Sequence, residues 1–231
     1  EQGGQRWFHL YPDEKITHDD ELHWTQPSQN WNSMCAECHS THLEKNYDPA
    51  ERVFSTRWSE IDVSCEACHG PGSDHVIWAE RKSGWDRLEA NKGLAIVLDE
   101  RKDVQWRIDP KTGNASRSKH RGSDKEIEMC ARCHSRRSPI SSDYVHGAPF
   151  LDHYLPRNLD QGMYFADGQI NDEVYVYGSF VQSKMYHAGV TCSDCHEPHS
   201  AKLRAPGADV CMQCHAGTYQ EPSHTHHQSA D

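Results

Sequence analysis

The motif Cys192-Ser193-Asp194-Cys195-His196 occurs five times in this 231-residue chain, with other residues at its two variable positions. The other four copies begin at Cys35, Cys65, Cys130 and Cys211. All ten cysteines of the chain belong to these motifs, so none is left over. Random placement of the same residues would give roughly 0.03 such motifs. The pattern is therefore a functional signature rather than a coincidence of composition.

The spacing within the motif suits covalent attachment of haem. Thiols at positions i and i+3 lie on one side of a helical turn, where each can form a thioether to a haem vinyl group. The histidine directly behind them then reaches the iron. We therefore predict five haem c groups, held by Cys35, Cys38, Cys65, Cys68, Cys130, Cys133, Cys192, Cys195, Cys211 and Cys214. Their proximal iron ligands are predicted to be His39, His69, His134, His196 and His215.

Three other uses of paired cysteines explain the pattern less well. Zinc ribbons pair their Cys-x-x-Cys units, but five units cannot pair evenly and zinc does not require a histidine behind each one. Disulfide scaffolds likewise have no use for that histidine. A thioredoxin-like redox site has one motif beside a βαβ pattern, which this sequence lacks.

The composition fits a fold organised around haems. The hydrophobic fraction is 35% and the mean hydropathy is −0.92, which is polar for a chain of this length. Five porphyrins would supply apolar surface in place of part of the side-chain core. We expect a mainly α fold with extensive irregular loop and little or no β-sheet, formed as one pentahaem domain over residues 1–231. The motif spacing predicts a haem pair at 35–69, a central haem at 130–134 and a second pair at 192–215, with haem-free excursions at 76–122 and 141–190.

Local signals place several motifs on short helices. Ser123 or Asp124 is predicted to cap a helix that runs into Cys130, and a similar helix opens at residues 207–209. The run at 70–73 should stop the second motif's helix and bring His75 towards a haem face. A helix is expected over 76–87 and a turn over 109–113. The aromatic-rich segment 141–190 should pack over the central haems, and its 174–177 stretch fits a strand or a helix, with helix favoured.

Thirteen histidines remain after the proximal ligands are assigned, and distal ligation is their natural use. A second imidazole makes the iron six-coordinate, which suits electron transfer better than catalysis. We expect His18, His120 and His187 to be surface residues, and the tail histidines His224, His226 and His227 either to be disordered or to ligate a haem at the edge of the chain. The distal candidates are His42, His75, His199, His153, His23, His9, His146 and His226.

Charge and hydropathy limit the partners and the location. The formal charge of −11 argues against nucleic acid, because phosphate binding needs clustered Lys and Arg. No apolar run is long enough for a membrane-spanning helix. Covalent haem attachment takes place outside the cytoplasm, so we expect a periplasmic or extracellular protein whose export signal is removed or lies outside this sequence.

The motif surroundings carry a family resemblance. The stretches at 30–41, 63–73 and 189–200 resemble the cytochrome c554-type multihaem family, and their order is similar to exported multihaem proteins that often carry tetratricopeptide repeats. The resemblance implies a helical, loop-rich fold with stacked and perpendicular haem pairs, and it supports His75 and His199 as distal ligands. Those relatives usually have further haem motifs and helical repeats, so this chain is a processed product, a fragment or a short member.

The functional hypotheses differ in class. The first is electron transfer, either by a discrete carrier or by a subunit of a conducting assembly, with redox proteins or copies of itself as partners. By analogy with extracellular haem filaments, histidine ligation can be shared between subunits. The alternative is a multihaem reductase of a small nitrogen or sulfur oxyanion with one open haem. A third is a structural haem-bound subunit that docks on a larger oxidoreductase. No catalytic residue is assigned, because no motif histidine is replaced by lysine.

Overall fold

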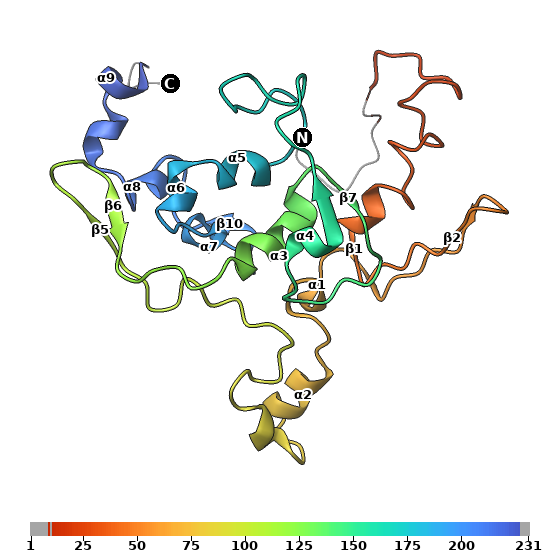
Figure 1. Ribbon diagram of the computed structural model, residues 1–231, viewed down its shortest axis with the longest axis horizontal. Helices are drawn as coiled ribbons and strands as arrows, with labels where there is room; N and C mark the ends of the chain where they lie inside the picture. The colour runs from red at the N-terminus through yellow and green to blue at the C-terminus, as the bar shows by residue number, and fades with distance from the viewer. Residues whose placement is uncertain (1–8, 10, 227–231) are drawn as a thin grey trace, which may run out of the picture. The chain divides into compact units, whose positions relative to one another are not determined.

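A computed structural model describes residue 9 and residues 11–226 of the chain (Figure 1). Within these residues the elements are short helices and minimal strand pairs joined by irregular chain. The prediction of a mainly helical and loop fold with little sheet is confirmed. The chain divides into two compact units, Glu1–Ala67 and Cys68–Asp231, which are described separately below. A single pentahaem domain stays a prediction.

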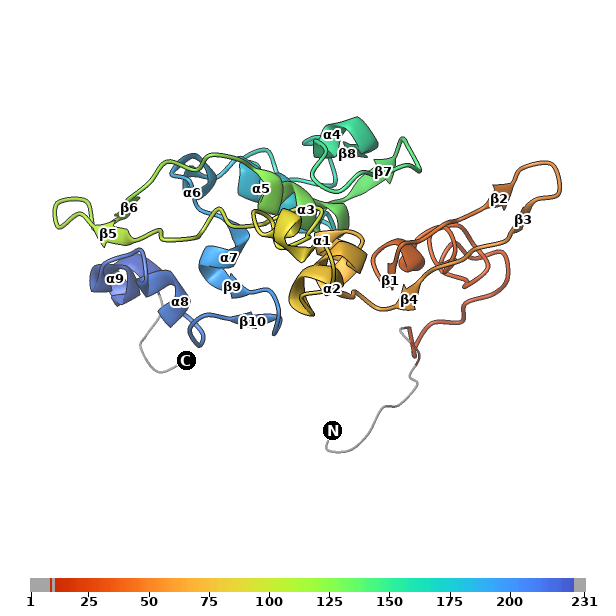
Figure 2. The same cartoon turned by 90° about the horizontal axis from the view of Figure 1, so that it is seen from below.

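The first unit holds one haem motif and two small antiparallel ladders. Strand β1 pairs with β4, and β2 pairs with β3 in a separate hairpin (Figure 2). Thr41 is fully buried, and its hydroxyl donates to the Asp62 carbonyl at 2.9 Å, which ties the chain after the first motif to the chain before the second. The elements are η1 Cys35–Glu37, β1 Ser40–Thr41, β2 Tyr47–Asp48, β3 Val53–Phe54 and β4 Glu60–Ile61, followed by α1 Cys65–His69 across the boundary.

The second unit is organised around α3, its longest described helix. Helices α4, α5 and α7 contact α3, and the hairpin β5–β6 lies beside the chain of the last motif (Figure 1). Its helices are α2 Ser73–Ala79, η2 Trp85–Leu88, α3 Lys125–His134, α4 Phe150–His153, α5 Tyr177–Val181, α6 Lys184–His187, α7 Cys192–Cys195, α8 Asp209–Met212, η3 Gly217–Gln220 and α9 Pro222–Thr225. Its strands are β5 Trp106–Ile108, β6 Ala115–Arg117, β7 Arg137–Pro139, β8 Tyr154–Pro156, β9 His196–Glu197 and β10 Lys202–Leu203.

The side-chain core of this unit packs against α3. Phe150 and Tyr154 are buried, with ring centres 5.1 Å apart, and both join Ala131 of α3 in one cluster. Tyr144 and Tyr177 pack around its edge. Aromatic residues after residue 141 therefore cover the helix that carries the central motif, while their packing over haems stays a prediction.

The start of α3 is stabilised differently from the prediction. The helix begins at Lys125 after Asp124, but neither Ser123 nor Asp124 caps it with its side chain. The Glu100 carboxylate instead accepts hydrogen bonds from the Glu126 backbone N–H at 3.0 Å and from the Ser123 hydroxyl at 2.7 Å. The cap is thus supplied by a residue that is distant in sequence, so no local motif could reveal it.

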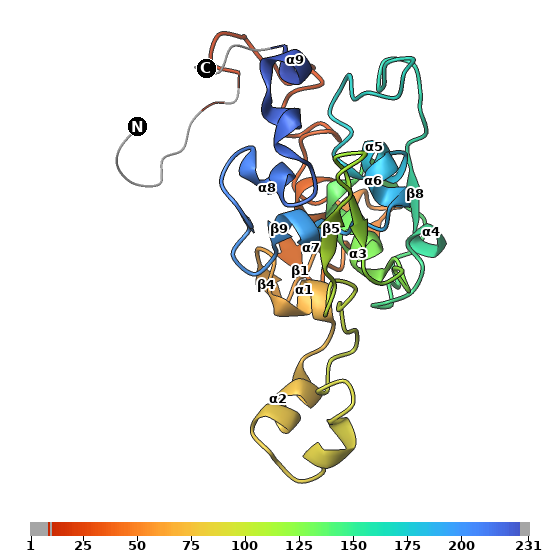
Figure 3. The ribbon, with the colours of Figure 1, turned by 90° about the vertical axis from the view of Figure 1, so that its left-hand side faces the viewer.

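Other local predictions are confirmed or corrected by the backbone. Helix α1 ends at His69, and Gly70 turns the chain with φ +74°, as expected of the 70–73 run. The predicted 76–87 helix is interrupted: α2 ends at Ala79, and η2 follows only after Gly84 with φ +84° (Figure 3). Glycine adopts this left-handed conformation readily, which favours a turn over a continuous helix. A hairpin turn over 109–113 and a helix from Asp209 are confirmed, and the favoured helix in the 174–177 region begins only at Tyr177.

The polypeptide encloses little apolar volume by itself. It exposes 16870 Å², whereas a compact chain of 26.4 kDa exposes about 10,600 Å². Large apolar side chains such as Ile61, Leu151 and Phe165 are more than half exposed. A side-chain core this small cannot account for the fold on its own.

Candidate haem sites

Each Cys-x-x-Cys-His motif lies on a helical turn. In the first motif the His39 backbone N–H donates to the Cys35 carbonyl at 3.0 Å, and in the fifth His215 does the same to Cys211 at 3.0 Å. The second and third motifs lie in α1 and α3, and the fourth begins in α7. This geometry places both thiols of a motif on one side of a turn, as two thioethers to one porphyrin require.

The motif cysteines form no disulfides, and two of them have a raised pKa. All ten cysteines are free of disulfides. Burial raises the pKa of Cys195 and raises the pKa of Cys214 to about 11. A redox-active or metal-binding Cys-x-x-Cys pair needs a lowered pKa, because the thiolate is the reactive species. The raised pKa values of Cys195 and Cys214 do not suit a reactive thiolate at those two positions.

Cysteines from distant motifs lie together in the second unit. The Cys130 thiol donates a hydrogen bond to the sulfur of Cys192, which raises the pKa of Cys130 and lowers the pKa of Cys192. Cys68 is close enough to raise the pKa of Cys130 further. Cys211 has the same electrostatic effect on the pKa of Cys195. The fold thus gathers the attachment edges of the second to fifth motifs.

Several imidazoles are oriented with Nε2 free to bind a metal. The Nδ1–H of His75 donates to the Lys92 carbonyl at 2.8 Å, and that of His69 donates to the Ile96 carbonyl at 3.5 Å. His215 donates from Nδ1 to the Asn114 side-chain oxygen at 2.9 Å (Figure 1 shows β6 beside this motif). An acceptor at Nδ1 fixes the proton there and leaves the lone pair on Nε2, which is the arrangement that metal-bound histidines use.

His199 has the same arrangement, with a carboxylate as acceptor. Its Nδ1 lies 3.2 Å from a Glu197 oxygen. Hydrogen bonds from Ser200 hold the pKa of Glu197 below its ordinary value, so this carboxylate is ionised and accepts well. A carboxylate partner raises the basicity of a ligating imidazole.

The rings of His69 and His199 lie close together and nearly parallel. Their centres are 6.3 Å apart and their planes differ by 11°. Two metal–nitrogen bonds of about 2 Å, plus about 1 Å from each nitrogen to its ring centre, span roughly 6 Å. The fold therefore brings a predicted distal ligand close to a predicted proximal one, at a ring separation that two imidazoles sharing one iron would have.

Two further candidates for distal ligands, His146 and His153, both contact the ring of Tyr144. His146 is half-buried and lies against Gly70, where a Cβ would be 3.1 Å from the imidazole Cγ. Gly70 directly follows His69, so His146 lies beside the second motif. The Nδ1 of His153 is buried without a hydrogen-bond partner, and its ring contacts Tyr144 edge-on at 5.1 Å. A buried, unpaired imidazole nitrogen is costly unless it serves a function.

The candidates of the first unit are placed differently. The Nδ1 of His9 accepts from the Tyr11 backbone N–H at 3.0 Å, and the Nδ1 of His23 accepts from Thr25 N–H at 3.3 Å. An accepting Nδ1 puts the proton on Nε2, which disfavours binding of iron through Nε2 in this geometry. His42 lies 3.1 Å from the Ser59 hydroxyl through Nδ1, which leaves either tautomer open.

The C-terminal histidines approach the fifth motif. Tyr219 contacts the rings of His215 and His224, with ring centres 4.9 Å and 4.7 Å away. His226 is exposed at the end of α9 with φ +59°. His227 lies outside the described residues. The Tyr219 ring therefore links His224 to the fifth motif, whereas the role of His226 as a distal ligand stays a prediction.

The residues present fit c-type haem. Five thiol pairs on helical turns, imidazoles with Nδ1 held by oxygen acceptors and a small side-chain core are the features that such a group requires. The acceptors Lys92, Ile96 and Asn114 could not be predicted from the sequence, because they act through a carbonyl or amide that no motif marks. No helix in the described part of the chain is long and apolar enough to cross a membrane.

Comparison with known proteins supports this interpretation. Residues 5–70 match the model of the cytochrome c554 and c-prime family, and residues 185–220 match the doubled CXXCH motif. The chain is similar to the multihaem cytochrome MtrA of Shewanella baltica (strain OS185), at 23% identity over 198 residues that cover 79% of this chain and 52% of that protein. It therefore spans about half the length of that relative. No solved structure matches the chain. Together with the Cys-x-x-Cys-His motifs, these matches support a multihaem c-type cytochrome.

Proposed function

We propose that this protein transfers electrons through five covalently bound haems with bis-histidine ligation. The gathering of cysteines from the second to fifth motifs carries this proposal, since haems attached there would lie near one another. The hydrogen bond between Cys130 and Cys192 links motifs that are 62 residues apart in sequence. An array of close, saturated haems suits conduction rather than binding of a substrate.

The haem irons supply the reversible one-electron chemistry, and the residues control how they do so. The motif cysteines fix each porphyrin covalently, and the motif histidine binds from one side. We assign His199 to the other side of the iron held by His69, on the basis of their ring spacing of 6.3 Å. His75, His146 and His153 are assigned as distal ligands in the same unit, because each is held beside a motif or at a buried position.

We also propose where the protein is located and how it works with its partners. Covalent haem attachment takes place outside the cytoplasm, so the protein is placed in the periplasm or at the cell exterior. It serves there as an electron carrier or as a subunit of a conducting, filamentous assembly, with redox proteins or further copies of itself as partners. The net charge of −11 favours basic surfaces on those partners.

Two measurements on the native, matured protein test the proposal. Intact-mass analysis should show five haem additions on one chain, and electron paramagnetic resonance of the oxidised protein should show low-spin ferric haem without a high-spin component. A mass with fewer than five additions would contradict the haem count. A high-spin signal that responds to nitrite or hydroxylamine would instead favour the reductase alternative, because that activity needs an open iron.

A further inference from the structure

A hollow of about 690 Å³ lies in the second unit between residues 115–124 and residues 186–189. Cofactors and other small molecules occupy pockets of about 300–1,000 Å³, so its volume suits a ligand of that size. None of the motif cysteines or histidines lines it. It contains two histidines, His120 and His187, that the sequence places at the surface.

The lining of the hollow is positively charged within an acidic chain. Arg117, Lys119 and Arg121 contribute cations, and Asp124 contributes a carboxylate that pairs with Arg121 at 2.6 Å. The Nε of Arg117 is buried without a partner, although its other nitrogens donate to backbone carbonyls. Lys119 is 57% exposed, with Asp103 as its nearest carboxylate at 3.9 Å. Arg117 therefore brings a cation that pairs with carbonyls rather than with a carboxylate, and Lys119 adds a second cation in a long, exposed ion pair, so the lining suits an anionic ligand.

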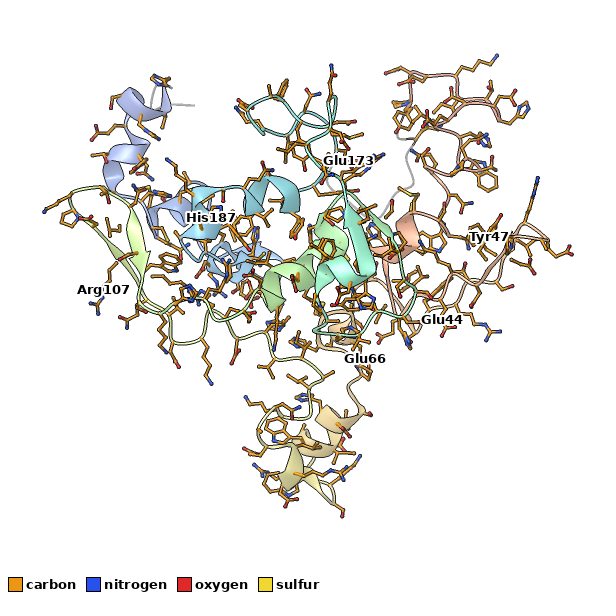
Figure 4. All side chains as sticks on the ribbon, viewed as in Figure 1. Glu44, Tyr47, Glu66, Arg107, Glu173 and His187 are labelled. Carbon is orange, nitrogen blue, oxygen red and sulfur yellow. The ribbon has the colours of Figure 1, made fainter. Side chains whose placement is uncertain are left out.

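His187 is held beside the hollow by a rigid neighbour. The hydroxyl of Tyr186 donates to Asp124 at 2.8 Å, and the Arg121 guanidinium lies 4.3 Å over the tyrosine ring. Ser183 caps α6, which fixes the backbone of His187 at the end of that helix (Figure 4). Neither ring nitrogen of His187 has a hydrogen-bond partner in the described part of the structure. His120, by contrast, lies in irregular chain.

Haem motifs flank the hollow on both sides. Ala115, which lines it, donates its backbone N–H to the Cys214 carbonyl at 2.7 Å. Gly189, which also lines it, is separated from Cys192 by two buried residues. The fourth and fifth motifs thus both reach the edge of this positively charged space.

We infer that the hollow receives the carboxylate edge of one of the chain's own haems, with Arg117 and Lys119 pairing with its propionates and His187 binding its iron as distal ligand. This inference rests on the proposed function, because it needs attached haem. It adds a ligand and a charge site that the sequence did not single out. Propionates paired with cations favour reduction of the iron, since positive charge stabilises the added electron.

The ligand assignment is tested with matured His187→Ala and His120→Ala proteins. We expect His187→Ala to convert one haem in five, about a fifth of the total, from low-spin to high-spin ferric iron, and added imidazole to restore the low-spin signal. His120→Ala should keep the wild-type spectrum. An unchanged spectrum in His187→Ala would overturn the inference, as would conversion in His120→Ala alone. Recovery with imidazole separates loss of a ligand from loss of the fold.

The charge assignment is tested with Lys119→Gln and a control that removes the same charge elsewhere. Arg107 is exposed on β5 and does not line the hollow (Figure 4), so Arg107→Gln is the matched control. Spectroelectrochemical titration should show that Lys119→Gln lowers the potential of one haem more than Arg107→Gln does. Equal shifts would refute propionate pairing, and saturable binding of inorganic phosphate that Lys119→Gln abolishes would show a free oxyanion site instead.

These outcomes are distinct from failure of the proposed function. If the wild-type protein carries five haems and is fully low-spin while His187→Ala is unchanged, the inference falls and electron transfer stands. If intact mass shows a bare polypeptide, both fall.

Discussion

Replacement of Phe150 by alanine tests whether side-chain packing on α3 stabilises the haem-bearing unit. Phe150 is fully buried and packs against Ala131, Tyr154 and Tyr177, with ring centres 5.1 and 5.2 Å from the two tyrosines. Truncation of a buried phenylalanine costs about 3–5 kcal/mol, and loss of two aromatic contacts favours the upper part of that range. With a guanidinium m-value of roughly 4 kcal/mol per M, the unfolding midpoint should fall by about 1 M.

The adjacent residue on the same helix provides the control. Leu151 is 61% exposed, so Leu151→Ala should change the free energy of unfolding by no more than about 0.5 kcal/mol. Far-ultraviolet circular dichroism of the matured proteins in guanidinium reports both midpoints. If Phe150→Ala and Leu151→Ala shift the midpoint equally, the aromatic cluster does not stabilise α3, and the covalent haems alone hold the unit together.

Three further predictions concern the haems and one buried acid. His199→Ala should convert the haem of His69 to high-spin iron, seen by electron paramagnetic resonance and reversed by imidazole, and a fully low-spin variant would contradict their pairing. Burial raises the pKa of Glu126 above 4.5, so the folded state holds that proton more tightly and stability falls as pH rises from 4.5 through the raised pKa. Glu126→Gln should flatten this fall in guanidinium midpoints measured across that window, whereas parallel pH profiles would refute it. Expression without haem attachment should give a chain that lacks cooperative unfolding in calorimetry, because the polypeptide core is small.

The sequence predicts a multihaem cytochrome, which the comparisons support, more readily than it predicts the local structure. Five motifs predict haem attachment because the thiol and imidazole spacing is set by a single helical turn, which is local geometry. The end of α1 at Gly70 was also predictable from local sequence, whereas the break at Gly84 was missed. The cap of α3 was not predictable, because Glu100 reaches Glu126 from another segment. The interaction depends on tertiary folding, which no local pattern encodes.

The choice among candidate distal histidines depends on the three-dimensional structure even more than the cap of α3 does. From the sequence alone, His9 and His146 are equally good candidates for distal ligands, since both lie among aromatic residues. The fold places His146 against Gly70, beside a proximal ligand, whereas the Nδ1 of His9 accepts from its own neighbour Tyr11. Which nitrogen carries the proton decides which residue can bind iron, and only the three-dimensional acceptors determine that.

The irregular segments of this protein contain backbone carbonyls that can accept hydrogen bonds from histidine side chains. Carbonyls inside helices and sheets are already paired with backbone N–H groups, so they cannot orient an imidazole. Lys92 lies in irregular chain after η2, and its carbonyl is free to accept from His75. The same segment approaches α2 so closely at Gly93 that a Cβ there would lie 2.6 Å from the His75 backbone nitrogen. With φ +70° at Gly93 as well, a side chain at this position would push the acceptor away from the imidazole. Short helices and long loops therefore leave backbone carbonyls available to set the tautomers of histidines that we propose as haem ligands.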